Sequence, residues 1–105
     1  MADLSQKDWT KKLKEDNNAV VLDVRTALEV EEGIIPGALH IDIYRGEGFV
    51  EDIQKLDTTK NYYVYCRSGG RSSQACAVMH QLGFKNAYNL LGGFSEWQGE
   101  VAQIN

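Results

Sequence analysis

The chain has 105 residues, of which 43% are hydrophobic and 25% charged, and its formal net charge is −4. This length predicts one domain over residues 1–105, without room for a second, and the acidic balance argues against nucleic acid or an anionic membrane as a partner. No apolar run reaches the ~20 residues that span a bilayer, and the polar N-terminus lacks the apolar stretch of a secretory signal. Two cysteines without a C-x-x-C pair fit a reducing compartment, so we expect a cytoplasmic protein. Nothing in the sequence demands an oligomer, and we expect a monomer.

Helical and strand patterns alternate along the chain. In chain order they predict a helix at 3–16, a strand at 19–24, a helix at 26–33, a strand at 38–41, a helix at 48–56, a strand at 61–66, a helix at 71–83, a strand at 86–90 and a last short helix within 92–101. Ser5 is the expected cap of the first helix, with Asp8 at the acidic third position of a capping box. The alternation predicts an α/β domain with a mainly parallel central sheet of about four to five strands, flanked by helices on both faces.

Cys66 ends the third predicted strand, at the edge of the sheet where such folds bind ligands. The residues after it open a helix, whose first turn has unpaired backbone N–H groups and a partial positive charge. Arg67 and Arg71 add two cations, and Gly69 and Gly70 let the backbone bend so that several N–H groups converge. These features favour the thiolate, which is the nucleophilic form, and predict a pKa below the ~8.5 of a free cysteine.

Cys66 also has a simpler interpretation, because a cysteine that ends a buried strand is often an inert core residue. Inert packing, however, does not require a flexible, cationic loop after the cysteine. Cys76, flanked by alanines in a predicted helix, is interpreted as a small helix residue and not as a resolving thiol. Asp23 and Arg25 follow a buried strand, and we interpret them as structural support, because buried polar groups need partners.

The spacing from Cys66 to Arg71 bears on the choice between enzyme classes. Cysteine-type phosphatases place five residues between the cysteine and an arginine, whereas here only four separate Cys66 from Arg71, and Ser72 stands at the phosphatase arginine position. The shorter loop makes a tighter cradle, better sized for a sulfur atom on the cysteine than for a tetrahedral phosphate. The loop length therefore argues against a phosphatase or arsenate reductase, and the presence of Cys66 and both arginines argues still more strongly against a non-catalytic domain.

Three segments together resemble the single-domain rhodanese-like (thiosulfate sulfurtransferase-like) family. They are LDVRTALEVEEGIIPGALHI, YCRSGGRS and LLGGFSEW, and they carry, in register, Asp23, Arg25, Glu29, Gly33, Pro36, Gly37, Ala38, Cys66, Arg71, Gly92, Gly93 and Trp97. The chain departs from the family at Ile34, where a histidine is frequent. The resemblance covers nearly the whole chain, and it implies the rhodanese-like fold.

The resemblance also implies a sulfurtransferase that works by double displacement. The Cys66 thiolate would take the outer sulfur of a small anionic donor such as thiosulfate, and a cyanide, small-thiol or protein-thiol acceptor, such as a thioredoxin-like protein, would then take it from the persulfide. The expected persulfide-binding residues are Arg67, Ser68, Gly69, Gly70, Arg71 and Ser72. No metal or organic cofactor is required. The alternative is a persulfide carrier that delivers sulfur to a protein partner.

Overall fold

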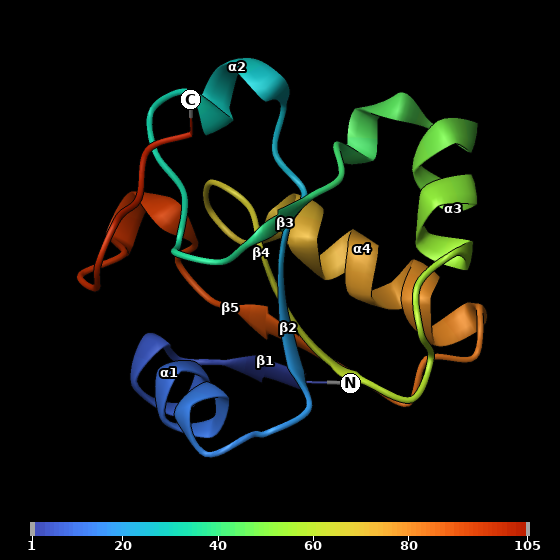
Figure 1. Ribbon diagram of the computed structural model, residues 1–105, viewed down its shortest axis with the longest axis horizontal. Helices are drawn as coiled ribbons and strands as arrows, with labels where there is room; N and C mark the ends of the chain where they lie inside the picture. The colour runs from blue at the N-terminus through green and yellow to red at the C-terminus, as the bar shows by residue number, and fades with distance from the viewer. Residues whose placement is uncertain (1, 105) are drawn as a thin grey trace.

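A five-stranded, fully parallel sheet forms the centre of the molecule (Figure 1). The structure is a computed structural model that describes residues 2–104. In the order β1-β5-β4-β2-β3, the sheet is built from β1 (Ala2–Leu4), β2 (Ala19–Asp23), β3 (Leu39–His40), β4 (Asn61–Tyr65) and β5 (Asn86–Leu90). The helices are α1 (Gln6–Lys14), α2 (Ala27–Val30), α3 (Glu47–Gln54) and α4 (Gly70–Gln81), with 3-10 turns η1 (Ile43–Arg45) and η2 (Phe94–Glu96). The predicted α/β fold with a parallel sheet is confirmed.

The first element corrects the sequence prediction. Residues 2–4 do not belong to the first helix: they form the edge strand β1, which pairs in parallel with β5, with Leu4 opposite Leu90. The helix begins only after Ser5, which has extended backbone angles and accepts a hydrogen bond from the Asp8 N–H. A three-residue strand is too short to show a period of two, and its partner strand lies near the other end of the chain.

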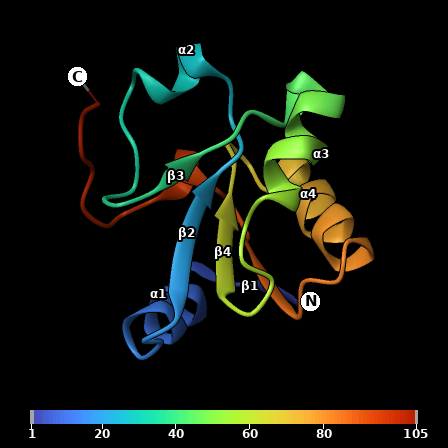
Figure 2. The same cartoon turned by 45° about the vertical axis from the view of Figure 1, so that its right-hand side comes forward.

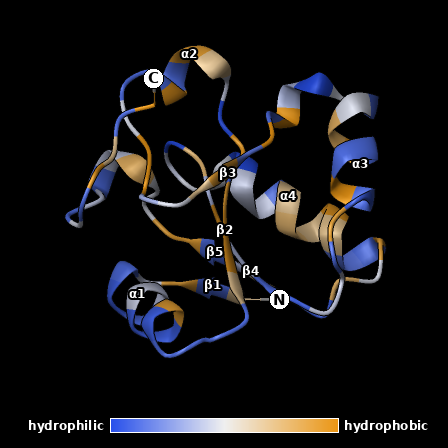
Figure 3. Cartoon of the chain, viewed as in Figure 1, coloured by the Kyte–Doolittle hydropathy of each residue, from blue (hydrophilic) through white to orange (hydrophobic). Residues whose placement is uncertain are grey.

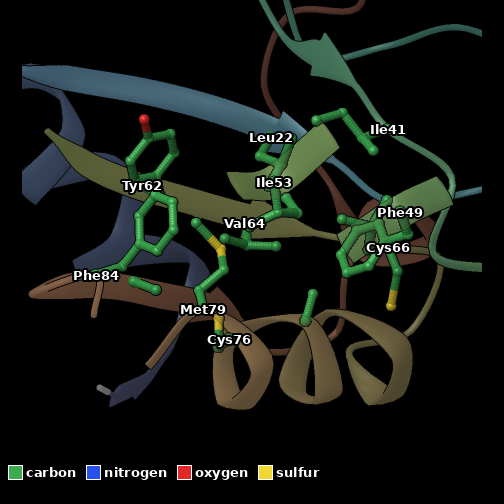
Figure 4. Packing of buried hydrophobic residues seen from close by; sticks show 13 residues of the cluster. Leu22, Ile41, Phe49, Ile53, Tyr62, Val64, Cys66, Cys76, Met79 and Phe84 are labelled. Atoms are coloured by element: carbon green, nitrogen blue, oxygen red, sulfur yellow. The ribbon is translucent and has the colours of Figure 1, made fainter. Parts of the chain in front are cut away.

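Helices cover both faces of the sheet, and alternate residues of β4 point to each face. Tyr62 and Val64 pack toward α3 and α4, together with Met79 of α4 (Figure 4). Tyr63 and Tyr65 pack on the opposite face, where the Trp9 ring of α1 meets both tyrosine rings edge-on. Because β4 is buried on both sides, its sequence reads as a continuous apolar run and not as an alternating one.

Figure 2 shows α3 and α4 on one side of the strands and α1 on the other. In Figure 3, β2 is mostly hydrophobic and α1 is largely hydrophilic. The lysines of α1 are exposed. None of the helices within residues 2–104 is long and apolar enough to cross a membrane.

The register between β2 and β4 brings the polar segments together. Asp23 pairs with Tyr65, so the two strands end side by side at the carboxyl edge of the sheet. Val24 and Cys66 therefore follow the ends of the two strands, and the Val24 N–H donates to the Tyr65 carbonyl. This is the edge at which the sequence predicts the functional loop.

Candidate active site

Cys66 lies directly after β4, with its sulfur directed toward the first turn of α4 (Figure 4). The residue is only 1% exposed. The sulfur accepts hydrogen bonds from the backbone N–H groups of Gly69, at 3.1 Å, and Ser72, at 3.3 Å. The Ser72 hydroxyl oxygen lies 3.3 Å from the same atom. The segment 66–72 therefore curls around the thiol, which is the arrangement that the glycine-rich loop predicts.

Hydrogen bonding, more than arginine charge, sets the acidity of this thiol. Burial alone raises the pKa of the Cys66 thiol, but hydrogen bonds from the side chain and N–H of Ser72, and from the N–H groups of Gly69 and Ser68, outweigh burial. The net pKa lies below its ordinary value. Cys76 differs, because burial raises the pKa of its thiol to about 12. Of the two cysteines, only Cys66 is poised to ionise.

Gly93 explains why the segment after β5 is part of the site. Its φ angle is 58°, and a Cβ atom there would lie 2.5 Å from the carbonyl oxygen of Arg67. The next two N–H groups bind the loop: Phe94 donates to the Cys66 carbonyl and Ser95 to the Arg67 carbonyl, both at 2.9 Å. Only glycine permits this close approach, which fixes the backbone of the Cys66 loop from outside.

Arg71 binds Glu29 of α2. Its guanidinium donates to both carboxylate oxygens of Glu29, at 2.7 and 2.8 Å, and it lies over the ring of Tyr44. The Arg71 hydrogen bonds lower the pKa of Glu29 to about 2, against the opposing effect of burial. The positive charge of Arg71 is thus largely balanced, and the side chain ties the loop to α2.

Sequence reasoning missed the function of Glu29. This residue completes a capping box at the start of α2: its carboxylate accepts from the Thr26 N–H, and the Thr26 hydroxyl accepts from the Glu29 N–H. The T-x-x-E pattern could have revealed the cap. The pairing with Arg71 could not be found in this way, because the two residues are far apart in the chain.

Arg67, the other loop cation, lies at the surface. Its side chain is 61% exposed, and its partner is the equally exposed Glu32, at 3.8 Å. A surface pair of this length holds its side chains weakly. Arg67 is therefore the loop cation that can turn toward an approaching anion.

Asp23 and Arg25 form a buried ion pair beside the loop. The Arg25 guanidinium donates to both Asp23 oxygens, at 2.8 to 3.1 Å, and to the Gly33 carbonyl at 2.6 Å. The ring of Phe94 stacks 4.2 Å from the guanidinium carbon. These contacts connect the end of β2, the segment after α2 and η2. The geometry is that of a support for the backbone around the site.

Ile34, at the position where the family often has histidine, has a backbone role. It forms an antiparallel bridge with Ala102, with hydrogen bonds of 2.8 Å in both directions. This bridge fastens the C-terminal segment to the turn after α2.

Asn89 of β5 is a second residue that sequence reasoning missed. It is 3% exposed and contacts both Ser72 and Gly69 of the loop. An asparagine within an apolar strand is itself a signal, because a buried amide must find partners. Over residues 2–104, no three His, Cys, Asp or Glu side chains gather as metal ligands would.

The parallel sheet, with a cysteine cradled by backbone donors at its carboxyl edge, defines the class of small α/β domains built around a reactive-cysteine loop. The family model described as "Rhodanese-like domain" matches residues 6–100. The chain therefore belongs to the rhodanese-like domain family, as the resemblance of its three segments predicts.

Relatives and solved structures agree with this assignment. The chain is 39% identical over 94 residues to YtwF of Bacillus subtilis, with 90% of this chain and 87% of YtwF covered. It is 36% identical over 91 residues to the thiosulfate sulfurtransferase GlpE of Pseudomonas entomophila, with 83% and 81% covered. A rhodanese-like domain protein from Staphylococcus aureus superposes with a TM-score of 0.84 at 25% identity over the whole of both chains. These similarities support rhodanese-type sulfur transfer.

Proposed function

We propose that this protein is a sulfurtransferase that moves a sulfane sulfur from a thiosulfate-like anion to a thiol acceptor through a persulfide on Cys66. The observation that carries the proposal is the sulfur of Cys66, held by the N–H groups of Gly69 and Ser72 with its pKa lowered. The thiosulfate sulfurtransferase GlpE, to which the chain is similar, supports thiosulfate as the donor.

In the first half-reaction, the Cys66 thiolate attacks the outer sulfur of the donor. A sulfur–sulfur bond forms on Cys66, the donor's own sulfur–sulfur bond breaks, and sulfite leaves with the electron pair of that bond. The product is a persulfide anion. Donors that converge on the loop interior stabilise this charge, as preorganised N–H groups do for other developing anions.

In the second half-reaction, an acceptor thiolate attacks the outer persulfide sulfur. The Cys66 thiolate leaves with the bonding electrons and the acceptor becomes a persulfide; with cyanide as acceptor, the product is thiocyanate. The two displacements share one covalent intermediate, so ping-pong kinetics are expected.

The two loop arginines take different roles in this proposal. Arg67, exposed at the loop, draws the dianionic donor toward the site and meets the departing sulfite. Arg71, bound to Glu29, holds the loop in the shape that presents its N–H groups. The remaining loop residues, Ser68 and Gly70, shape the backbone around the outer sulfur.

An assay of the purified protein with thiosulfate and cyanide tests the proposal directly. We expect thiocyanate formation that Cys66→Ser abolishes and that Cys76→Ser, the matched control, retains. Mass spectrometry after thiosulfate alone should show a gain of one sulfur atom, mapped to Cys66. Undiminished turnover by Cys66→Ser would refute the assignment, and Cys66-dependent hydrolysis of an aryl phosphate would favour a phosphatase instead.

The exposed apolar side chains near the loop favour a second candidate, a carrier that delivers sulfur to a protein. Leu28, next to Glu29 on α2, is 75% exposed, and Tyr44, which covers the Arg71 guanidinium, is 70% exposed. Apolar surface of this kind suits a protein acceptor. Turnover should then be slow with cyanide and faster with a thioredoxin-like protein. Equal rates with both acceptors would argue for the free-standing enzyme.

A further inference from the structure

The orientation of the Asn89 amide is determined by its neighbours. Its nitrogen donates to the Gly69 carbonyl, at 3.2 Å, and to the Asp3 carboxylate, at 3.0 Å. Both neighbours are oxygens that only accept, so the nitrogen must lie on that side. The amide oxygen therefore faces Ser72, whose hydroxyl oxygen is 2.5 Å away.

This orientation determines where the Ser72 proton points. An amide oxygen can only accept, so the short contact requires the Ser72 hydroxyl to donate its single proton to Asn89. The hydroxyl oxygen then turns a lone pair toward the Cys66 sulfur, at 3.3 Å. A neutral thiol suits this arrangement, because its S–H can donate to Ser72 and complete a chain from sulfur to hydroxyl to amide.

An anionic sulfur requires a different arrangement. Once Cys66 has lost its proton, the Ser72 lone pair would face a negative charge. Rotation of the hydroxyl moves its proton from the Asn89 oxygen to the sulfur, which gains this donor beside the N–H groups of Gly69 and Ser72. These backbone donors are present in both states, so only the hydroxyl changes its partner.

We propose that Asn89 is a positioning residue for the sulfur chemistry: it holds the Ser72 hydroxyl proton while Cys66 is a neutral thiol and releases it when the sulfur is anionic. The same amide fixes the Gly69 carbonyl, so the loop keeps its shape while the hydroxyl turns. This inference rests on the proposed function only in taking Cys66 as the sulfur that ionises. Asn89 reaches the sulfur through Ser72, and its own hydrogen bonds go to Ser72, Asp3 and Gly69.

The charged groups around Ser72 and Asn89 do not compete for the Ser72 proton, which can go to the Asn89 oxygen or to the Cys66 sulfur. Arg71 is bound by Glu29, and Arg67 is exposed at the surface. Asp3, from β1, contacts the nitrogen side of the Asn89 amide and not Ser72. Cys76, on α4, stays neutral because burial raises its pKa to about 12.

A double-mutant cycle tests the proposal. The pKa of Cys66 is measured from the pH dependence of its alkylation by iodoacetamide between about pH 5 and pH 10, in Cys76→Ala protein, with and without Asn89→Leu and Ser72→Ala. Removal of the Asn89 oxygen costs the thiol state one hydrogen bond, so Asn89→Leu should lower the pKa of Cys66. At pH values below that pKa, alkylation should become about fivefold faster. With Ser72→Ala present, Asn89→Leu should have no such effect.

The sign of the shift separates the proposal from a purely structural role. If Asn89 only supports the loop, its loss loosens the N–H donors, and the pKa rises in both backgrounds. A rise, or an equal shift with and without Ser72, overturns the proposal. Alkylation uses no sulfur donor, so the outcome is independent of whether sulfur transfer is found.

A second measurement leaves Asn89 unchanged and needs no stable Asn89 variant. The side-chain carbonyl ¹³C resonance of Asn89 should titrate together with Cys66, because the amide oxygen loses its donor when the sulfur ionises. Ser72→Ala should remove this titration while Cys66 still ionises. An Asn89 resonance that ignores the Cys66 titration, or that follows it equally in Ser72→Ala, contradicts the proposal.

Discussion

Arg71 and Glu29 bind each other through two charge-assisted hydrogen bonds, 2.7 and 2.8 Å long, with both side chains only 18% exposed. The pair joins the first turn of α4 to the first turn of α2, although the two residues are 42 positions apart in the chain. A bidentate pair shielded in this way is stronger than an ordinary surface ion pair. It makes the loop shape depend on α2.

Glu29→Gln should therefore destabilise the protein. It removes the charge from the pair and weakens the α2 cap, and we expect a loss of about 1–2 kcal/mol in the free energy of unfolding, measured by urea denaturation. The matched control is Glu32→Gln, which breaks the exposed pair with Arg67 and should change stability by less than about 0.5 kcal/mol. Equal effects of the two substitutions would show that the Arg71–Glu29 pair is no stronger than a surface contact.

The same pair predicts an acid-sensitive stability. The folded-state pKa of Glu29 is depressed from 4.5 to about 2, so its contribution is fully present above the unfolded value and is lost as the pH falls through the folded one. The free energy of unfolding of the native sequence should fall between about pH 4.5 and pH 2. Over that interval Glu29→Gln should show a shallower fall, and parallel curves for the two proteins would contradict the assignment.

Gly93 should tolerate alanine poorly. Its positive φ angle costs any L-residue about 1–2 kcal/mol, and the added Cβ would also meet the Arg67 carbonyl. Gly37 is a matched control, because it has a φ angle of 82° but no atom within 4 Å of the added Cβ. Gly93→Ala should lose at least about 1 kcal/mol more than Gly37→Ala in urea denaturation. Equal losses would mean that the loop yields without strain.

The two cysteines should differ in reactivity. At neutral pH, limiting iodoacetamide should label Cys66, whose pKa is lowered, and spare Cys76, whose pKa is about 12. Peptide mass spectrometry at short times would give the ratio. In urea, where both thiols are free of the fold, the preference should disappear. Comparable labelling of both cysteines in the native protein would show that the loop does not activate Cys66.

The sequence predicted the elements that carry a local signal. Strands β2 and β4 are mostly apolar runs between polar breaks, and β5 is a short strand pattern that contains two asparagines. The predicted bounds of all three agree with the structure to within one residue. The Cys66 loop was found because its cysteine, glycines and arginines are adjacent. The family assignment, from three such segments, is confirmed.

What could not be predicted depends on contacts between distant parts of the chain. The sequence places two cations beside the sulfur, but it does not show that Glu29 takes up one of them. It likewise gives no reason to connect Asn89 with Ser72. These pairings arise from the parallel register and the position of α2, which a single sequence does not encode locally.

The carbonyl groups of the Cys66 loop have a consequence for selectivity. Those of Cys66 and Arg67 are occupied by the N–H groups of Phe94 and Ser95, and that of Gly69 by the Asn89 amide. With these oxygens held outward, a peptide plane cannot easily turn to offer one to the sulfur. The sulfur therefore faces N–H groups of the loop and not the carbonyl oxygens of these peptides. Such a lining suits a sulfur anion. A soft metal cation, which a bare thiolate would attract, finds no further ligand among these carbonyl oxygens.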